Sequence, residues 1–351
     1  MSNKKYARRT EIKLYFKGVN ISKELSKYLL SLSYTDKEED ETDDISLSLD
    51  DREGKWIRNW LGSGGKEKKA YKGTEIRPII IQKNMLSDGK DKVLDCGVFE
   101  IDEVDYSGPP EKVTIKATSI PYKTKLRQTK HNKAWENTTL KNIASRIAKN
   151  SNMKLLYESD YNPKYKRKEQ INKTDIVFLK KLCKDAGISL KVTSKVIVMF
   201  DAAKYEQKNE VKKLKKGKGN ILSYSFSTKT ADTAYSSCHV MYTEPKTNKK
   251  IEYTYKPPKA NKDGQKLEIK QKVSSVAEAK ILAKKMLRSK NKGETTASFT
   301  LVGDPELVAG ITVRVYGYGE FNGKYIVEEA KHNITGGYKT EIKLRSCLEG
   351  Y

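Results

Sequence analysis

The sequence contains few of the residues that usually carry catalysis or bind metal ions. Histidine is the commonest source of general acid–base groups and metal ligands, and the three histidines lie more than ninety residues apart: His131, His239 and His332. The four cysteines are also far apart, and no pair has the spacing of a metal site: Cys96, Cys183, Cys238 and Cys347. This distribution predicts reduced, buried thiols and no metal site.

The chain also lacks the motifs of common enzymes and of membrane spans. It has no GxSxG, phosphate-binding loop, HExxH or CxxC motif. No run of 18 apolar residues occurs, which excludes an ordinary transmembrane helix. The N-terminus is basic and passes directly into a strand-like alternation without an apolar signal segment. We therefore expect cytoplasmic synthesis, no catalytic residue, no cofactor and no membrane as a stable partner.

Two acidic groups and one histidine are candidate sites with a structural alternative. Alternation places Glu103 and Asp105 on one face of an expected strand and Asp102 on the other, which favours a wet sheet face over the paired acids of a glycoside hydrolase. The acidic run at residues 36–44 is expected to be a solvated loop; a calcium site is the alternative, although the ordered spacing of a calcium loop is missing. His332, near a strand end, is expected to be structural.

Positive charge is abundant but has little arginine in it. Seventy Lys and Arg residues face 45 Asp and Glu, a formal charge of +25, and only eleven of the seventy are arginine. Arginine recognises nucleic-acid bases and phosphates better than lysine does, because its planar guanidinium presents several N–H donors in a fixed geometry. The lysines are spread along the chain, and their densest cluster, KKLKKGK at residues 212–218, is expected to be a loop. The charge therefore leaves DNA binding open without favouring it.

The segment at residues 44–61, DISLSLDDREGKWIRNWL, is the most distinctive stretch of the chain. It begins as a strand with every second residue apolar and then turns into a charged run broken by Gly54. Two of the three tryptophans follow, four residues apart, so both indoles would lie on one side of a helical turn. We select five of its residues as a candidate assembly or interface site: Asp50, Asp51, Arg52, Trp56 and Trp60.

The pattern of elements divides the chain into three parts. The first is dominated by expected strands, including residues 10–17, 75–83 and 93–106. The centre has two amphipathic helices, one opening at Thr139 and one between Thr174 and Gly187, followed by two short strands. Residues 207–219 are expected to form a linker to the last part. The last part has one expected helix, which begins with a capping box of Ser275 and Glu278. Its expected strands are at 221–227, 233–243, 295–302, 311–318, 324–332 and 338–345.

One further motif interleaves tyrosine with lysine. Tyr161 and Tyr165 lie among basic residues up to Lys168 in an expected polar loop. Such a segment can stack on single-stranded bases, and the same composition suits a protein interface. The residues alone leave both readings open.

Three stretches resemble the phage late control protein D family, the tail hub proteins of contractile tails. The segment at residues 44–61 is similar to the family's strand, acidic–Arg, Gly and aromatic segment. TLKNIASRIAKNSNMKLLY with NKTDIVFLKKLCKDAGISLKV resembles its central helix pair. The last, GDPELVAGITVRVYGYGEFNGKYIVEEAKHNITGGYKTEIKLR, resembles its C-terminal strands. Together they span roughly residues 10 to 346, and the chain departs from the family in the lysine-rich loop after Leu61.

The resemblance implies a mainly β fold with an α+β part: two tail-tube-like antiparallel β-barrel domains at residues 1–119 and 206–351, and a small central α/β domain at 120–205. It implies a homotrimer that adapts a six-fold tail tube to a three-fold central spike. Expected partners are the chain itself, the spike, the tube or tube-initiator protein, baseplate wedge proteins and the tape measure protein, with DNA only as passing cargo. The place of action would be the baseplate of a virion or phage-tail-like particle released by lysis.

Two alternative functions remain open from the sequence: a DNA-binding late regulator, and a tail-associated cell-wall hydrolase. Under the hub reading, the five residues of the 44–61 segment would serve assembly. Asp50, Asp51 and Arg52 would pair at a barrel rim, and Trp56 and Trp60 would anchor the following segment on the barrel or on a neighbouring copy.

Overall fold

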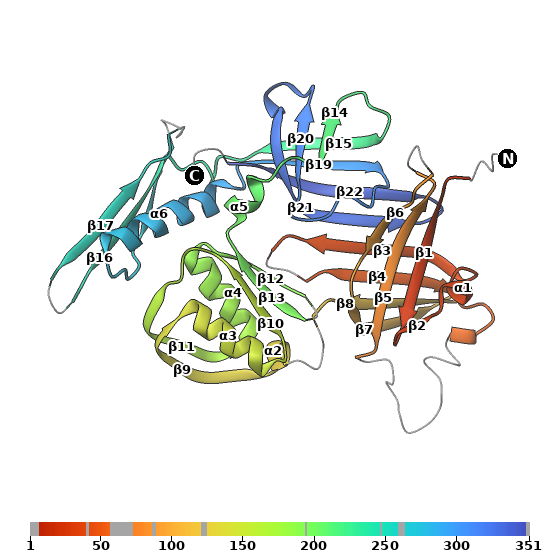
Figure 1. Cartoon of the computed structure of the whole chain (residues 1–351), viewed down its shortest axis with the longest axis horizontal. Coiled ribbons are helices and arrows are strands. Elements are labelled where there is room, and N and C mark those ends of the chain that lie inside the picture. The colour runs from red at the N-terminus through yellow and green to blue at the C-terminus, as the bar shows by residue number, and fades with distance from the viewer. Residues whose placement is uncertain are drawn as a thin grey trace.

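The computed structural model describes residues 7–39, 42–56, 73–85, 89–120, 125–193, 195–245, 248–258 and 264–348. Over these residues the chain is mainly β, with large antiparallel sheets and fewer helices, as predicted (Figure 1). Within the same ranges, no helix is long and apolar enough to cross a bilayer. Three regions follow one another along the chain.

The first β-region owes its strands to strict alternation. Ile45, Leu47 and Leu49 are buried while the serines between them are half-buried, so one face of the strand enters the core. The region consists of β1 Arg9–Phe16, β2 Val19–Asn20, α1 Ser22–Leu25, β3 Leu29–Lys37, β4 Asp44–Asp50, β5 Glu75–Lys83, β6 Lys92–Asp95, β7 Phe99–Ser107 and β8 Lys112–Thr118.

The central region packs two helices against short strands. Thr139 caps the first helix by accepting the Asn142 amide at 3.2 Å, and the second helix ends at Gly187 in the left-handed conformation. The apolar faces of both helices share one core. The elements are α2 Lys125–Gln128, β9 Lys130–Thr139, α3 Leu140–Asn150, β10 Lys154–Glu158, β11 Lys164–Thr174, α4 Asp175–Ala186, β12 Ser189–Val192, β13 Val196–Phe200 and α5 Ala202–Glu206.

The polar loop expected around Tyr165 is instead a strand. β11 pairs antiparallel with β9 in a two-stranded ribbon beside the helices. Neither strand has an apolar alternation, so the sequence pattern missed them. Their inward polar group, Gln170, is fully buried and satisfied: it accepts from Trp135 Nε1 at 3.2 Å and donates to the Asp175 carboxylate at 2.8 Å.

The last β-region contains β14 Lys212–Lys215, β15 Ile221–Thr228, β16 Ser237–Thr243, β17 Lys250–Tyr255, β18 Lys266–Ile269, α6 Val276–Asn291, β19 Thr295–Val302, β20 Thr312–Tyr316, the 3-10 helix η2 Gly319–Phe321, β21 Gly323–Ile334 and β22 Tyr338–Ser346. The expected loop at 212–218 is partly wrong, because β14 pairs in parallel with β20. Its only apolar residue, Leu214, is buried, and one residue gives no periodicity to read. The cap at Ser275 is confirmed, because Ser275 Oγ accepts the Glu278 amide at 3.1 Å. The Glu278 carboxylate accepts the amide of Ser274, one residue before the cap, at 2.8 Å.

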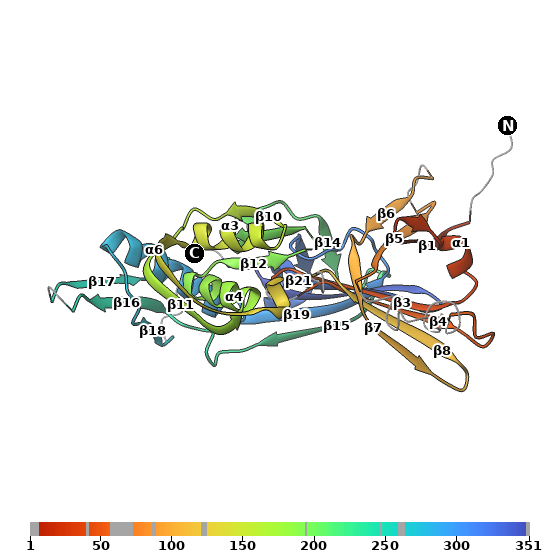
Figure 2. The same cartoon turned by 90° about the horizontal axis from the view of Figure 1, so that it is seen from below.

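One 14-stranded sheet joins the first and last regions, although the whole central region, from β8 at Thr118 to β14 at Lys212, separates them along the chain. Its main path runs β15-β19-β22-β21-β3-β4-β8-β7-β5-β1-β2. The junction is antiparallel pairing between β21 and β3, from Glu329 opposite Lys37 to Ile334 opposite Leu32. In Figure 1 the strands from β15 to β7 lie one below another on the right, with the central region and the β16–β18 sheet to the left (also Figure 2).

Two parts of this sheet repeat the same topology. The first four-strand unit has the spatial order β3-β4-β8-β7, and the second has β15-β19-β22-β21. When the four strands of each unit are numbered in chain order, their spatial order in both units is first, second, fourth, third. Each unit also has an extra strand on the start of its third strand: β5 pairs with β7, and β20 pairs with β21. The chain therefore holds one β-unit twice.

Candidate assembly surfaces and a buried charge cluster

The charged turn after β4 is ordered by its own acidic residues. The buried carboxylate of Asp51 accepts the Trp56 amide at 2.7 Å, which ties the turn to the residues that follow. Asp50 accepts the Arg52 amide at 3.0 Å and lies 3.4 Å from the Arg52 guanidinium, which is largely exposed. Asp51 thus organises the turn, while Arg52 is available at the surface.

Trp56 belongs to the core of the first region. Its side chain is buried and meets the Tyr28 ring edge-on at 6.0 Å between centroids. Lys55 Nζ lies 5.2 Å from the centroid of the Tyr28 ring and donates to its hydroxyl at 2.6 Å. Trp60 lies outside the described residues. The assembly role of these five residues remains a prediction; the local packing adds that Trp56 supports the fold.

The acidic pair Glu103 and Asp105 and the histidine His332 lie in ion pairs or in the core. Lys116 Nζ lies 3.1 Å from both Glu103 and Asp105, on the wet face that alternation predicted for these two carboxylates. His332 is fully buried, with Nδ1 2.7 Å from the Tyr338 hydroxyl and its ring stacked on Tyr34. Burial lowers the pKa of His332 to about 4, so it is neutral at pH 7. Over the described ranges, no three His, Cys, Asp or Glu side chains gather to hold a metal ion.

The Tyr–Lys motif resolves into a core part and a surface part. Tyr161 is 6% exposed and Tyr165 packs against the same central core. The lysines line a groove of about 720 Å³ between the β9/β11 ribbon and the segment that leads into α6. Both tyrosines also contribute to the wall of this groove.

A buried charge cluster, absent from the sequence-based candidates, joins all three regions at Arg345. This guanidinium is fully buried on β22, where Nη2 lies 3.3 Å from Glu38 and Nε lies 3.1 Å from Glu328. It also pairs with Glu206 on α5. Arg288 of α6 reaches the same Glu206 carboxylate. Side chains from α5, α6, β21, β22 and the residue that follows β3 therefore meet at one point.

The cluster balances desolvation against opposite charge. Burial disfavours charged carboxylates, yet Arg345 and Arg288 hold the pKa of Glu206 below its usual range. At Glu38 burial prevails over Arg345 and raises the pKa. Removing one member of such a buried set costs about 3–5 kcal/mol, because it leaves another charge uncompensated. The cluster thus makes the relative placement of the three regions specific.

A second buried group ties the central region to β3. Lys191 of β12 lies 2.6 Å from Asp36 and 3.3 Å from Asp43, and donates to the Lys37 carbonyl at 2.7 Å. Burial raises the pKa of Asp43 to about 6, although Lys191 opposes the shift. Asp36 also accepts the amide of Ala309 at 2.9 Å. The acidic segment expected as a solvated loop is therefore partly an interior contact in its described residues.

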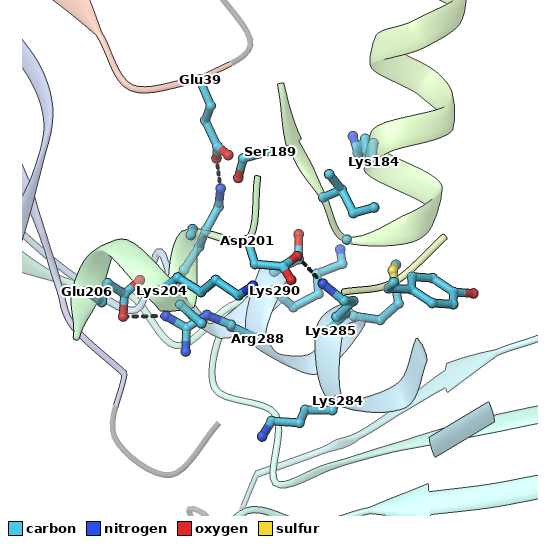
Figure 3. Close-up of a pocket in the computed structure, with 18 of the residues that line it drawn as sticks. Glu39, Lys184, Ser189, Asp201, Lys204, Glu206, Lys284, Lys285, Arg288 and Lys290 are labelled. Carbon is cyan, nitrogen blue, oxygen red and sulfur yellow. Dashed lines mark hydrogen bonds and ion pairs between the residues drawn. The ribbon is translucent and has the colours of Figure 1, made fainter. Parts of the chain in front are cut away.

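Beside the Arg345 cluster lies a cleft of about 680 Å³ between the central region and α6 (Figure 3). Eight basic and five acidic residues line it, and six of the basic ones are ion-paired: Lys204, Lys285, Arg288, Lys290, Lys292 and Arg345. Gly187 closes one wall, and a Cβ there would stand 2.7 Å from the Lys285 Cβ. Four of these ion pairs join different regions: Lys285–Asp201, Arg288–Glu206, Lys292–Glu39 and Arg345–Glu206.

Sequence reasoning could not find this cluster. Glu38, Glu206 and Arg345 are separated by more than a hundred residues each, and none stands in a motif. Each looks like one more charge in a chain where a third of the residues are charged. Only the three-dimensional packing of α5 and α6 onto β22 distinguishes them.

Comparison with known proteins places the chain among tail proteins. A family model described as phage tail baseplate hub (GPD) matches residues 107–338. A probable baseplate hub protein of Escherichia phage 186 is 24% identical over 192 residues. That match covers 52% of this chain and 43% of the relative, which is less than half of the relative's length.

Solved structures share the fold at low identity. A tail protein from Neisseria meningitidis MC58 is 13% identical with a TM-score of 0.66, covering 96% of both chains. A 43 kDa tail protein of prophage MuSo2 from Shewanella oneidensis is 15% identical with a TM-score of 0.66, covering 97% of this chain and 99% of that one. The E. coli c3393 protein, a type VI secretion component, is 10% identical with a TM-score of 0.54, covering 97% and 78%.

Proposed function

The chain belongs to the phage tail baseplate hub (GPD) family, and from that premise we propose that it is the structural hub of a contractile tail or tail-like particle. Three copies would form a ring that adapts a six-fold tail tube to a three-fold central spike. The role is structural: the side chains that gather in the described residues hold regions together and have the surroundings of ion pairs and core packing.

One observation carries this proposal: the four-strand unit occurs twice in one chain, with the same strand order. A ring of three chains would present six such units. Six similar units match a six-fold tube on one side, while three chains match a three-fold spike on the other. The symmetry change then needs no extra protein, because each chain supplies two neighbouring positions of the six.

The division into parts supports the same arrangement. We propose tube-like units at residues 1–119 and 206–351, flanking a small α/β unit at 120–205. Buried apolar residues form separate clusters within 14–117, 120–199, 214–344 and 238–287. The Arg345 cluster would fix the α/β unit against both β-units, so that each chain enters the ring as one preset body.

The proposed partners are other copies of the chain, the spike below, the tube or tube-initiator protein above, baseplate wedge proteins and the tape measure protein. DNA would pass as cargo at most. The protein would be made in the bacterial cytoplasm and act in the tail baseplate after release by lysis.

Co-expression with the spike and tube proteins of the same tail tests this function. The chain should co-purify with both, and antibodies against it should label the tube–spike junction in electron micrographs. A chain that remains separate from both proteins, or that labels the tail elsewhere, would refute the hub assignment.

A further inference from the structure

We propose that the ring closes by antiparallel pairing of β7 in one copy with β15 in the next, in the register that β21 and β3 have within each copy. The occupant of each exposed edge is thus a second copy of this chain. The inference rests on the proposed hub function and adds to it the strands, the register and the facing residues.

The strand registers align the two four-strand units residue by residue. The first strands to compare are β3 with its partner β4, and β15 with its partner β19. β3 reads LLSLSYT from Leu29, and β15 reads ILSYSFS from Ile221. Ser33 lies opposite Ser46 on β4, as Ser225 lies opposite Ser298 on β19. Both strands have an irregularity one residue in, at Leu30 and Leu222, and both leucines are exposed.

The last two strands of the units align in the same way. The register of β7 against β8 shifts between Ile101 and Glu103, and that of β21 against β22 shifts between Val327 and Glu329. Each shift is followed by a lysine–glutamate pair across the strands. Lys116 lies 3.1 Å from Glu103, and Lys343 lies 3.0 Å from Glu329. Glu103 is therefore the counterpart of Glu329, and Tyr106 that of His332.

The aligned units differ in what their outer edges contact. β21 of the second unit pairs with β3 of the first. In the part of the chain that the structure describes, the counterpart edges remain open: β15 pairs with β19 alone, and residues 103–107 of β7 pair with β8 alone. Joining β7 of one copy to β15 of the next repeats the internal junction and continues the sheet from chain to chain.

The composition of β15 also indicates that it is covered. Edge strands are usually protected from pairing by charged residues. Among described strands longer than two residues, every other edge strand carries Lys, Arg, Asp or Glu, whereas β15, ILSYSFST, carries none. It exposes apolar surface as well, with Leu222 51% and Tyr224 45% exposed. In a chain with 33% charged residues, an eight-residue neutral edge fits a permanent partner strand.

The internal junction predicts which residues face each other. Asn333 lies opposite Ser33, His332 opposite Tyr34 and Glu329 opposite Lys37. The same register between two copies places Ser107 of one copy opposite Ser225 of the next. It also places Tyr106 opposite Phe226, and Glu103 opposite Lys229. Tyr106, now 43% exposed, would stack on Phe226 as His332 stacks on Tyr34 at 5.8 Å.

Disulfide trapping tests this register. The variant Ser107→Cys with Ser225→Cys is co-expressed with the spike, oxidised, and run on a non-reducing gel beside each single variant. Paired strand positions lie within disulfide reach, so most of the chain should shift to covalent dimers and trimers. The pair Ser107→Cys with Ser223→Cys, two residues out of register, should give far less.

The controls separate this inference from the hub function. Native mass of the same samples reports whether three copies are assembled. A trimer without the Ser107–Ser225 cross-link, or with equal linking at Ser223, overturns the proposed pairing while the hub assignment stands. A chain that stays monomeric beside its spike overturns the hub assignment, and the pairing with it. The single variants exclude linking through Cys347, which is half-buried, while the other cysteines are buried.

Discussion

Arg345 on β22 and Glu206 on α5 form an ion pair in which both side chains are buried. The pair joins the long sheet to the helix that leaves the central region. Glu38 extends it to the end of β3, and Arg288 extends it to α6. Because the same cluster touches every region, its loss should affect the whole chain and not one element.

Replacing Arg345 with Met tests the cluster. The change leaves buried carboxylates without their cation, so the free energy of unfolding should fall by about 3–5 kcal/mol. Chemical denaturation followed by fluorescence measures the change. Arg314→Met is the matched control, because its pair with Glu210 at 3.2 Å is partly exposed and should contribute about 1 kcal/mol or less. Equal losses in the two variants would contradict the account.

His332 should make stability depend on pH. Its folded pKa of about 4 is below the ordinary value of 6.5 because of burial. The unfolded chain therefore binds more protons in this window, so the contribution is fully present above pH 6.5 and is lost as pH falls toward 4. The loss amounts to about 3 kcal/mol.

The measurement is the difference in unfolding free energy between the wild type and His332→Gln at pH 7 and at pH 4.5. The wild type should lose more than the variant on acidification. Asp43, whose pKa is raised, titrates with the opposite sign, but it is common to both proteins and cancels in the difference. A difference that does not change with pH would show that His332 is not buried as described.

Gly187 is constrained both by its left-handed backbone and by its close contact with Lys285. Gly217, which has only the left-handed backbone, allows the two effects to be measured separately. Gly187 and Gly217 both have positive φ, but only at Gly187 does a Cβ meet Lys285 at 2.7 Å; at Gly217 the space is open. Alanine at either site should cost about 1–2 kcal/mol for the left-handed backbone. Gly187→Ala should cost about 1–3 kcal/mol more for the clash. Thermal unfolding of both variants measures this, and an equal loss would refute close contact between α4 and α6.

The two tryptophans of the 44–61 segment should behave differently. Trp56→Ala empties a buried site and should lower the stability of the first β-region by about 3–5 kcal/mol. Trp60→Ala should impair folding or trimer assembly, according to the predicted anchor role. Denaturation and native mass of each variant distinguish the effects. A Trp60→Ala protein that assembles with unchanged stability would remove Trp60 from the candidate site.

Local patterns predicted most elements but not their long-range pairing. Alternation located β4 and β5, and the caps at Thr139 and Ser275 located α3 and α6, because these signals lie within a few residues. β9, β11 and β14 were missed because polar or single apolar residues give no period. The pairing of β3 with β21 depends on contacts between residues about three hundred apart, which no local pattern encodes.

The candidate residues show the same limit. Glu103 and Asp105 were assigned to a wet face from alternation, and their ion pairs with Lys116 agree. The likeness of LLSLSYT and ILSYSFS indicates no repeat by itself, because serine and aliphatic alternation is common to many strands. The two segments are recognised as a repeat only from the strand register, which aligns Ser33 with Ser225. The Arg345 cluster had no signal in the sequence.

In the proposed hub, one chain supplies two of six ring positions, so that three chains complete the ring. Native mass spectrometry of the hub purified with its spike measures the number of copies directly. We expect three copies of the 40.0 kDa chain in each complex. Six copies, with each chain filling one position, or a single copy on the spike would contradict it.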